Sequence, residues 1–175
     1  PDEIYMLLEN GTSIGFYEAW MAAMTYMLQL YFDFSGYCDM GIGLARLFGI
    51  NLPINFNSPL KATSFANFWR TWHISLTRFF TDYLYNPIAL KLMKVTSKNN
   101  SQLFSYLAMV IVPTSITFII TGVWHGAGWN FVVFGALNGL FMSISVINQK
   151  YFYHFKLTLI NRAIVLVTTS FVFVY

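Results

Sequence analysis

Residues 99–149 form a run of 51 residues without one Asp, Glu, Lys or Arg. A helix that crosses a bilayer needs about 20 predominantly apolar residues, so a run of this length has room for two. The segments 103–121 and 129–147 each approach that length, and a short glycine-rich stretch, 122–128, joins them. We therefore expect two membrane-spanning helices here, connected by a tight turn.

The composition of the whole chain also indicates a protein embedded in a lipid bilayer. Of its 175 residues, 57% are apolar and only 10% are charged, whereas an ordinary soluble domain carries about 25% charged residues. This balance indicates an all-α, multi-pass membrane protein and disfavours a soluble enzyme, a disordered linker or a disulfide scaffold. The single cysteine, Cys38, excludes an internal disulfide and a cysteine-based zinc cluster.

Two further segments are candidate spans. One is 15–32, which a single glutamate interrupts, and the other begins at residue 163 and is too short to complete a span. The sequence opens on Pro1, without an initiator Met or the basic and apolar regions of a signal peptide. We interpret the chain as one partial transmembrane domain, residues 1–175, from a longer multi-pass protein.

The charges are distributed unevenly along the chain. Residues 1–39 hold six acidic residues and no Lys or Arg, residues 40–98 hold seven basic residues and one acidic residue, and residues 150–175 hold three basic residues and no acidic one. Basic segments that flank spans tend to stay on the cytoplasmic side. We therefore predict that both basic segments are cytoplasmic and that the hairpin between them turns toward the outer side.

The first basic segment also carries a helical pattern. Ser58 and Pro59 suit an N-cap and a first helical position, and Asn86 and Pro87 suit an end. Apolar residues recur between them at spacings of three and four. We expect one amphipathic helix over about 59–86, lying in the membrane interface or packed beneath the spans. Its apolar face would be formed by Phe65, Phe68, Trp69, Trp72, Leu76, Phe79, Phe80, Tyr83 and Leu84.

Gly135 and Gly139 are separated by three residues in the second half of the uncharged run. Small residues at this spacing let two membrane helices approach closely. We expect them to serve helix packing.

His125 is the only imidazole in the uncharged run, and Gly122, Gly126 and Gly128 surround it. Glycines permit irregular backbone and the close approach of a substrate. Ionisable side chains at membrane depth are costly enough that a functional role is their default interpretation. The alternative is a histidine that only hydrogen-bonds a neighbouring helix, and the residues alone leave both possibilities open.

Three other ionisable groups lie near the expected helices. His73 falls on the edge of the amphipathic helix, where it would be either an interfacial histidine or a site residue. Asp33 and Asp39 bracket a glycine-containing stretch at the end of the first span. A break there would expose them to water or pair them with Arg46, while a structural ion pair or a helix-end carboxylate is the simpler account.

Four separated blocks of sequence stand out. In chain order they are Tyr31-Phe-Asp-Phe-Ser-Gly-Tyr-Cys-Asp-Met-Gly-Ile-Gly43, Asn55-Phe56 followed by Ser58-Pro59, Phe68-Trp-Arg-Thr-Trp-His-Ile-Ser-Leu76 and Gly122-Val-Trp-His-Gly-Ala-Gly-Trp129. They resemble the membrane-bound O-acyltransferase (MBOAT) family, in particular its bacterial branch, which includes proteins that acetylate alginate or transfer D-alanine to teichoic acids. Four blocks in this order are far more specific than one short motif.

The resemblance implies a many-helix membrane enzyme with a funnel. It implies that His125 is the catalytic residue and that His73 lies close to the reaction path. We add a set of substrate-path candidates, some of which the resemblance marks as structural or pore-lining: Asp33, Ser35, Asp39, Trp124, Trp129 and Asn130.

The expected activity is O-acyl transfer. An acyl group, expected to be acetyl, would pass from an activated thioester, acyl-CoA or an acyl carrier protein, to a hydroxyl of an extracytoplasmic polysaccharide or another cell-envelope glycan. His125 would take the hydroxyl proton, and His73 would orient the acyl donor or donate to the oxyanion. We expect direct transfer, because the sequence singles out no nucleophile among Ser35, Ser75 and Cys38. No tightly bound cofactor and no metal is expected.

The expected surroundings are the bilayer of the bacterial cytoplasmic (inner) membrane and accessory proteins of an envelope-modification complex, with no nucleic acid as partner. Two other functions stay open. One is a non-catalytic carrier or channel in which His125 and Asp39 line a polar path. The other is a purely structural subunit of an envelope-polysaccharide complex. Acyl transfer with and without His125 would separate them.

Overall fold

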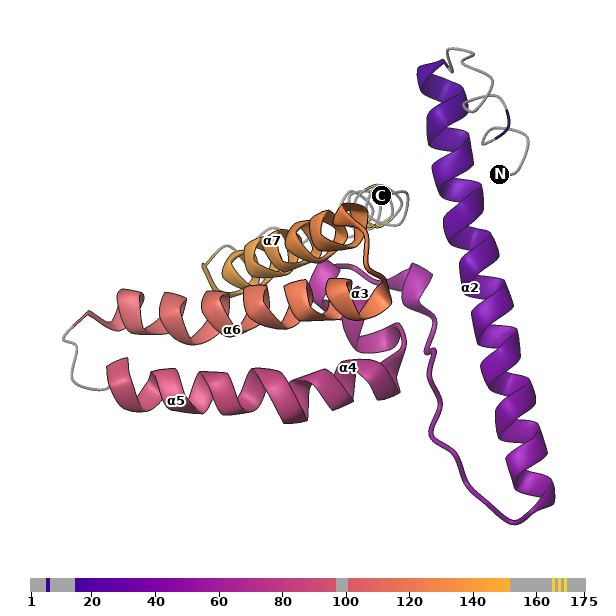
Figure 1. Ribbon diagram of the computed structural model, residues 1–175, viewed down its shortest axis with the longest axis horizontal. Coiled ribbons are helices and arrows are strands. Elements are labelled where there is room, and N and C mark those ends of the chain that lie inside the picture. Colours follow the sequence, from indigo (N-terminus) through magenta and orange to yellow (C-terminus); the bar gives the residue numbers. More distant parts are fainter. Residues whose placement is uncertain are drawn as a thin grey trace.

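The computed structural model describes residues 6, 15–96, 101–151, 165, 167 and 169. Within these residues every regular element is a helix (Figure 1). In chain order the elements are α2 (Phe16–Leu47), the 3-10 turn η1 (Pro59–Lys61), α3 (Phe65–Thr71), α4 (Ile74–Phe80), the π-helix η2 (Thr81–Tyr85), α5 (Asn86–Thr96), α6 (Gln102–His125) and α7 (Trp129–Tyr151). The predicted all-α class is confirmed, and the candidate span from residue 163 lies outside the described residues apart from three single positions.

The helices α6 and α7 form the hairpin that the uncharged run predicts. They lie side by side in Figure 1, with α5 along the other side of α6. Both are long and apolar enough to cross a membrane. At the open end of the hairpin the Lys150 ammonium lies 3.2 Å from the centre of the Tyr106 ring.

Glycines allow α6 and α7 to touch through their backbones. A Cβ at Gly135 would collide with the main-chain oxygen of Phe118, and a Cβ at Gly122 would collide with that of Phe131. The packing role predicted for Gly135 is therefore confirmed. Gly122, which we associated with irregular backbone near the histidine, is instead a buried residue inside α6.

The helix α2 is longer than the predicted segment 15–32. It continues without interruption through Gly36 to Leu47, so the break considered as one alternative for the stretch after Asp33 does not occur. A single glycine costs a helix about 1 kcal/mol relative to alanine, and the hydrogen bonds on either side hold the helix together. Only α6 and α7 pass the combined test of length and hydropathy among the described helices, so a span at 15–32 stays a prediction.

The single amphipathic helix predicted over 59–86 is wrong, because the segment is divided into η1, α3, α4 and η2. The cap of α3 is Ser64, whose hydroxyl accepts from the Asn67 amide at 3.1 Å. Ser58 has φ 51° and makes no cap hydrogen bond. Asn86 does not end the segment but begins α5, since a proline is tolerated in the first turn of a helix.

The short helix α3 is buried against the hairpin and does not lie exposed at an interface. Its Phe65, Phe68 and Trp69 belong to one cluster of buried apolar residues with Phe134 of α7. We call this cluster and the aromatic residues packed on it the aromatic core. Its members are Ala62, Phe65, Phe68, Trp69, Trp72, Phe134 and Val165, with Leu30, Tyr31, Phe56, Phe118, Leu137, Phe141 and Met142 packed against them.

Candidate active site

His73 interrupts the helical conformation of the chain between α3 and α4. It is the N-cap of α4, with φ 43° and ψ 56°, a left-handed conformation that few residues other than glycine adopt. Its main-chain oxygen accepts the first hydrogen bond of α4 from the Thr77 amide at 3.0 Å, while its side chain makes no cap hydrogen bond. The imidazole is therefore not used to close the helix.

An extended segment that precedes η1 holds this break in place. The amide of Ile74 donates to the main-chain oxygen of Asn55 at 2.9 Å, and the amide of Asn57 donates to the oxygen of Thr71 at 3.0 Å. These two bonds lie on either side of the break. The first bond gives the Ile74 amide, in the first turn of α4, a partner that the helix itself does not supply. Together the two bonds fix the backbone of His73.

The imidazole of His73 is half-buried among aromatic rings. The Phe34 ring from α2 meets it edge-on, with centres 4.7 Å apart, and the Phe56 ring is stacked on it at 6.4 Å. Burial lowers the pKa of His73 below its ordinary value, and the neighbouring His125 imidazole contributes in the same direction. A lowered pKa keeps this imidazole neutral near pH 7.

His125 is the last residue of α6, at the turn of the hairpin. Its ring lies 4.9 Å from the Trp124 ring and 5.7 Å from the Phe134 ring. The Trp124 ring in turn meets Phe80 of α4 edge-on at 6.1 Å. His125 itself is exposed.

The structure brings the two predicted histidines to the same region. His73 contacts Phe56 and His125 contacts Phe134, and both of these rings belong to the aromatic core. Two imidazoles from distant parts of the sequence therefore contact the same aromatic core.

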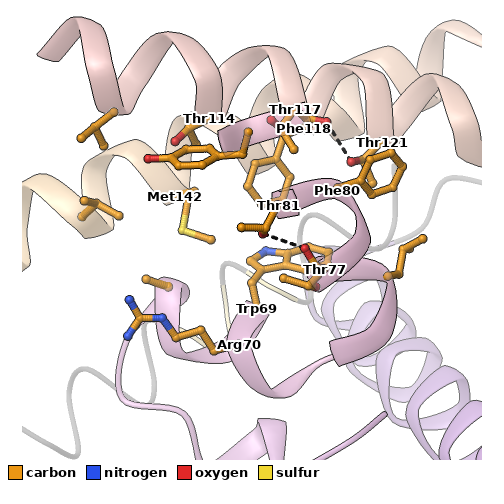
Figure 2. A pocket seen from close by; sticks show the side chains of 15 residues that line it. Trp69, Arg70, Thr77, Phe80, Thr81, Thr114, Thr117, Phe118, Thr121 and Met142 are labelled. Carbon is orange, nitrogen blue, oxygen red and sulfur yellow. Dashed lines mark hydrogen bonds between the residues drawn. The ribbon is translucent and has the colours of Figure 1, made fainter. Parts of the chain in front are cut away.

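A cavity of about 350 Å³ lies next to this site, between α3 and α4 on one side and α6 on the other (Figure 2). Thr77 and Thr121 stand one helical turn from His73 and His125, respectively, and both line the cavity. Its wall is mostly apolar, with Arg70 at its edge. The full lining is Ala66, Trp69, Arg70, Leu76, Thr77, Phe80, Thr81, Tyr85, Val110, Thr114, Thr117, Phe118, Thr121, Met142 and Val146.

The hydroxyls in this cavity differ in their hydrogen bonding. Thr81 donates to the main-chain oxygen of Thr77 in α4 at 2.7 Å, and Thr121 donates to that of Thr117 in α6 at 2.8 Å. The hydroxyl of Thr117 is buried and has no hydrogen-bond partner among the described residues. A buried hydroxyl without a partner is costly, so Thr117 is a natural contact for a polar group of a ligand.

The predicted path residues of α2 do not reach the two histidines within the described part of the chain. Asp33 and Asp39 are exposed, and the hydroxyl of Ser35 bonds back to the oxygen of Phe32 at 3.4 Å. The residues of α2 that face the site are Phe34, which contacts His73, and Cys38. No ion pair joins the two carboxylates to Arg46 in the described residues.

The candidates at the hairpin turn fall into two groups. Trp124 contacts both His125 and Phe80. Trp129 is 83% exposed and Asn130 is exposed at the start of α7, so neither has a contact that ties it to the site. Among the described residues no three His, Cys, Asp or Glu side chains gather as a metal site would require.

Two features of the site escaped the sequence interpretation. One is the role of Asn55, which belongs to a block of the family resemblance but carried no assigned function. The other is the cavity, whose threonines come from α4, η2 and α6. Thr114, Thr117 and Thr121 recur at spacings of three and four, and this stripe of hydroxyls within an apolar helix was the available signal.

Comparison with known proteins decides the family. Residues 5–171 match the model of MBOAT, the membrane-bound O-acyltransferase family. The chain belongs to this family. The four blocks that suggested the resemblance are therefore parts of an MBOAT chain, and His73 and His125 each stand within one of these blocks.

Similar full-length proteins come from several bacteria. This MBOAT chain is 47% identical over 136 residues to the peptidoglycan O-acetyltransferase of Helicobacter pylori, covering 78% of the chain and 24% of that protein. It is 39% identical over 127 residues to the probable alginate O-acetylase AlgI of Azotobacter vinelandii, covering 73% and 23%. It is 31% identical over 120 residues to the teichoic acid D-alanyltransferase of Streptococcus thermophilus, covering 69% and 28%. The chain thus spans about a quarter of the length of these curated relatives.

Proposed function

We propose that this chain carries the reaction centre of a membrane O-acyltransferase that acylates a hydroxyl of an extracytoplasmic polysaccharide or another cell-envelope glycan. The observation that carries the proposal is the convergence of His73 and His125 on one aromatic core, beside a cavity. Family membership supports the reaction class. The relatives named as O-acetyltransferases support acetyl as the group transferred.

The chemistry needs few groups because a thioester is already activated. The acceptor oxygen attacks the carbonyl carbon of the thioester while His125 takes the hydroxyl proton. The carbon–sulfur bond of the tetrahedral intermediate then breaks, and the proton passes from His125 to the leaving sulfur. We propose direct transfer from donor to acceptor, with His73 positioning one of the two substrates.

The cavity suits the donor side of this reaction. Binding sites for small organic groups are mostly apolar and contain a few well-placed polar groups, and the cavity combines apolar walls with threonine hydroxyls. Its lining follows α6 from Val110 to Thr121, roughly 16 Å at 1.5 Å per residue. We place the thioester arm of acyl-CoA or of an acyl carrier protein here, leading toward His125.

The cellular setting follows from the same proposal. Two helices fit for a bilayer and the membrane-bound family place the protein in a membrane, which we propose is the bacterial cytoplasmic (inner) membrane. Curated relatives are named for peptidoglycan, alginate and teichoic acid, so we propose an envelope glycan as acceptor. Accessory proteins of an envelope-modification complex belong to the proposal as well.

The direct test is acyl transfer by the complete protein with His125→Ala. Loss of a general base costs about a hundredfold or more in rate, while the exposed position of His125 predicts little change in membrane insertion or abundance. Transfer of radiolabelled acetyl from the thioester donor to glycan is measured at matched protein levels. Retention of more than about a tenth of the activity would overturn the assignment.

A matched control is His154→Ala, because His154 is a histidine of the basic segment 150–175, away from the family blocks. It should transfer acyl groups at the wild-type rate. Equal acyl transfer by His125→Ala and His154→Ala would show that His125 is not the base, whereas absence of ester formation by the wild-type protein would indicate a carrier or a structural role. A carrier would show transport of the glycan or the acyl donor without formation of the ester.

A further inference from the structure

The side-chain amide of Asn55 stands at the centre of the contacts around His73. Its Oδ1 accepts from the Ser75 amide at 3.0 Å and from the Ser75 hydroxyl at 2.6 Å. The same oxygen lies 3.4 Å from Nδ1 of His73. On its other side, Nδ2 of Asn55 donates to the Cys38 sulfur of α2 at 3.6 Å.

These contacts fix which end of the amide faces the histidine. The main-chain amide of Ser75 can only donate a hydrogen bond, so the group it meets at 3.0 Å must be the oxygen of Asn55. An amide oxygen can only accept. Nδ1 of His73 therefore has to carry a proton if the two are to form a hydrogen bond.

The same argument determines whether the second ring nitrogen of His73, Nε2, carries a proton. A neutral imidazole has one N–H and one lone pair, and the buried, aromatic surroundings of this ring keep it neutral near pH 7 by lowering its pKa. With the proton on Nδ1, the lone pair is on Nε2. The titratable groups that face the ring are His125 of α6 and, through Asn55, Cys38 of α2.

We infer that Asn55 is a positioning residue, which holds His73 as the Nδ1–H tautomer and so presents Nε2 to the reaction as a hydrogen-bond acceptor. This inference rests on the proposed function, in which His73 positions a substrate. It decides between the two roles expected for His73. A neutral Nε2 acceptor can hold an N–H or O–H of a substrate, but it has no proton to donate to an oxyanion.

Asn55 also caps α4, so a test must separate the tautomer from simple support of the fold. Asn55→Asp keeps an acceptor for Ser75 and for Nδ1 of His73, and it places a negative charge beside the ring. Asn55→Leu is close in size and removes the acceptor. Asn57→Asp is the matched control. Asn57 lies two residues after Asn55 and is exposed, and only its main-chain amide takes part in the contacts around His73, by donating to the oxygen of Thr71.

The readout that does not depend on activity is the ring ¹⁵N signal of His73 in proteoliposomes of the complete protein, assigned by its loss in His73→Gln. We expect the Nδ1–H tautomer in the wild type and in Asn55→Asp, with the pKa of His73 raised in Asn55→Asp by the new carboxylate. Asn55→Leu should populate both tautomers. Asn57→Asp should leave the signals and the titration of His73 unchanged.

Acyl transfer supplies the second readout. Misplacing a group that positions a substrate costs up to about a hundredfold in rate, so Asn55→Leu should lose about tenfold to a hundredfold while Asn55→Asp stays within a few-fold of the wild type. An Nε2–H tautomer in the wild type, or an unmoved titration in Asn55→Asp, overturns the role of Asn55. If His73→Ala is fully active while the ¹⁵N signals behave as expected, the proposed part of His73 in the reaction fails and the effect of Asn55 on its tautomer stands.

Discussion

His73 and Asn55 illustrate how one residue is stabilised in a conformation that its own chemistry disfavours. The left-handed backbone of His73, with φ 43°, costs of order 1–3 kcal/mol for a residue other than glycine. The cap supplied by Asn55 offsets this, since a capping interaction contributes about 0.5–2 kcal/mol. The arrangement turns the imidazole toward Phe34 and Phe56 and away from the helix that it begins.

The positioning role of His73 predicts a graded response to substitution. His73→Ala should lower acyl transfer, and His73→Gln should recover part of it, because the amide oxygen still accepts a hydrogen bond although the amide takes no proton near pH 7. Activity per molecule is measured for both variants at matched protein levels. Two near-normal rates would show that His73 is an interfacial histidine with no part in the chemistry.

Thr117 offers a test of the cavity as the site of the donor. Its buried hydroxyl has no partner among the described residues, so we expect it to bond a polar group of the donor. Thr117→Val keeps the volume and removes the hydroxyl, which should raise the KM for the thioester about fivefold, corresponding to about 1 kcal/mol for one hydrogen bond. Thr117→Leu adds volume and should raise it further.

Thr25→Val is the control for this experiment, because Thr25 is exposed on α2 and its hydroxyl bonds only to its own helix at Met21 and Ala22. It should leave the KM for the donor unchanged. A KM that is the same in Thr117→Val, Thr117→Leu and Thr25→Val would place the donor elsewhere.

At Gly135 the backbones of α6 and α7 approach each other closely. A Cβ added there would meet the main-chain oxygen of Phe118, which is part of a helix and has no room to move alone. Gly135→Ala should therefore separate the two helices and destabilise the protein by about 1–3 kcal/mol. The midpoint of thermal unfolding in detergent measures this loss.

Ala136→Leu is the matched control, since Ala136 is the next residue of α7 and is exposed. A larger side chain there should leave the midpoint of unfolding nearly unchanged. Equal midpoints for Gly135→Ala and the wild type would contradict the close packing of α6 against α7 at Gly135.

The helices that the sequence predicted best are those whose boundaries depend on the bilayer. Absence of charge over 99–149 marks α6 and α7 because burying a charge in lipid is costly wherever the rest of the chain lies. The break at His73 was invisible to the same reasoning. It depends on hydrogen bonds from Asn55 and Asn57, which come from an extended segment that helical periodicity does not describe.

The candidate site likewise contains residues that the sequence indicated, while other residues that the sequence suggested lie away from it. His73 and His125 were found because an imidazole in an apolar sequence is rare, and the family blocks marked both. The carboxylates of Asp33 and Asp39 were chosen for the same rarity, yet α2 continues through the stretch between them and leaves both exposed. Which side of a long helix faces the site depends on tertiary packing, and a single sequence does not contain that information in readable form.

At the scale of the whole molecule, the hairpin separates two chemically different ends. The turn end holds His125 and meets His73, while the open end holds Lys150 stacked on Tyr106, with the exposed Lys91 and Lys94 on the neighbouring helix α5. The cavity follows α6 between these ends. If the end with these lysines faces the cytoplasm, His73 lies toward the outer side, so the cytoplasmic location predicted for all of 40–98 would hold only for the part of that segment in α5. A donor made in the cytoplasm would then enter from the lysine end and reach the histidines at the turn end.

This orientation can be tested by labelling with an impermeant thiol reagent. With Cys38 replaced by alanine, a cysteine at Lys94 should react only after the inner face is exposed, because basic flanks stay on the cytoplasmic side. A cysteine at Ala127, exposed in the turn of the hairpin, should react in intact cells or spheroplasts from the outer side. The two sites serve as controls for each other, since each is exposed and each lies at one end of the hairpin. Labelling of position 94 in intact cells, with position 127 protected, would reverse the orientation and would bring the donor to the histidine end of the cavity first.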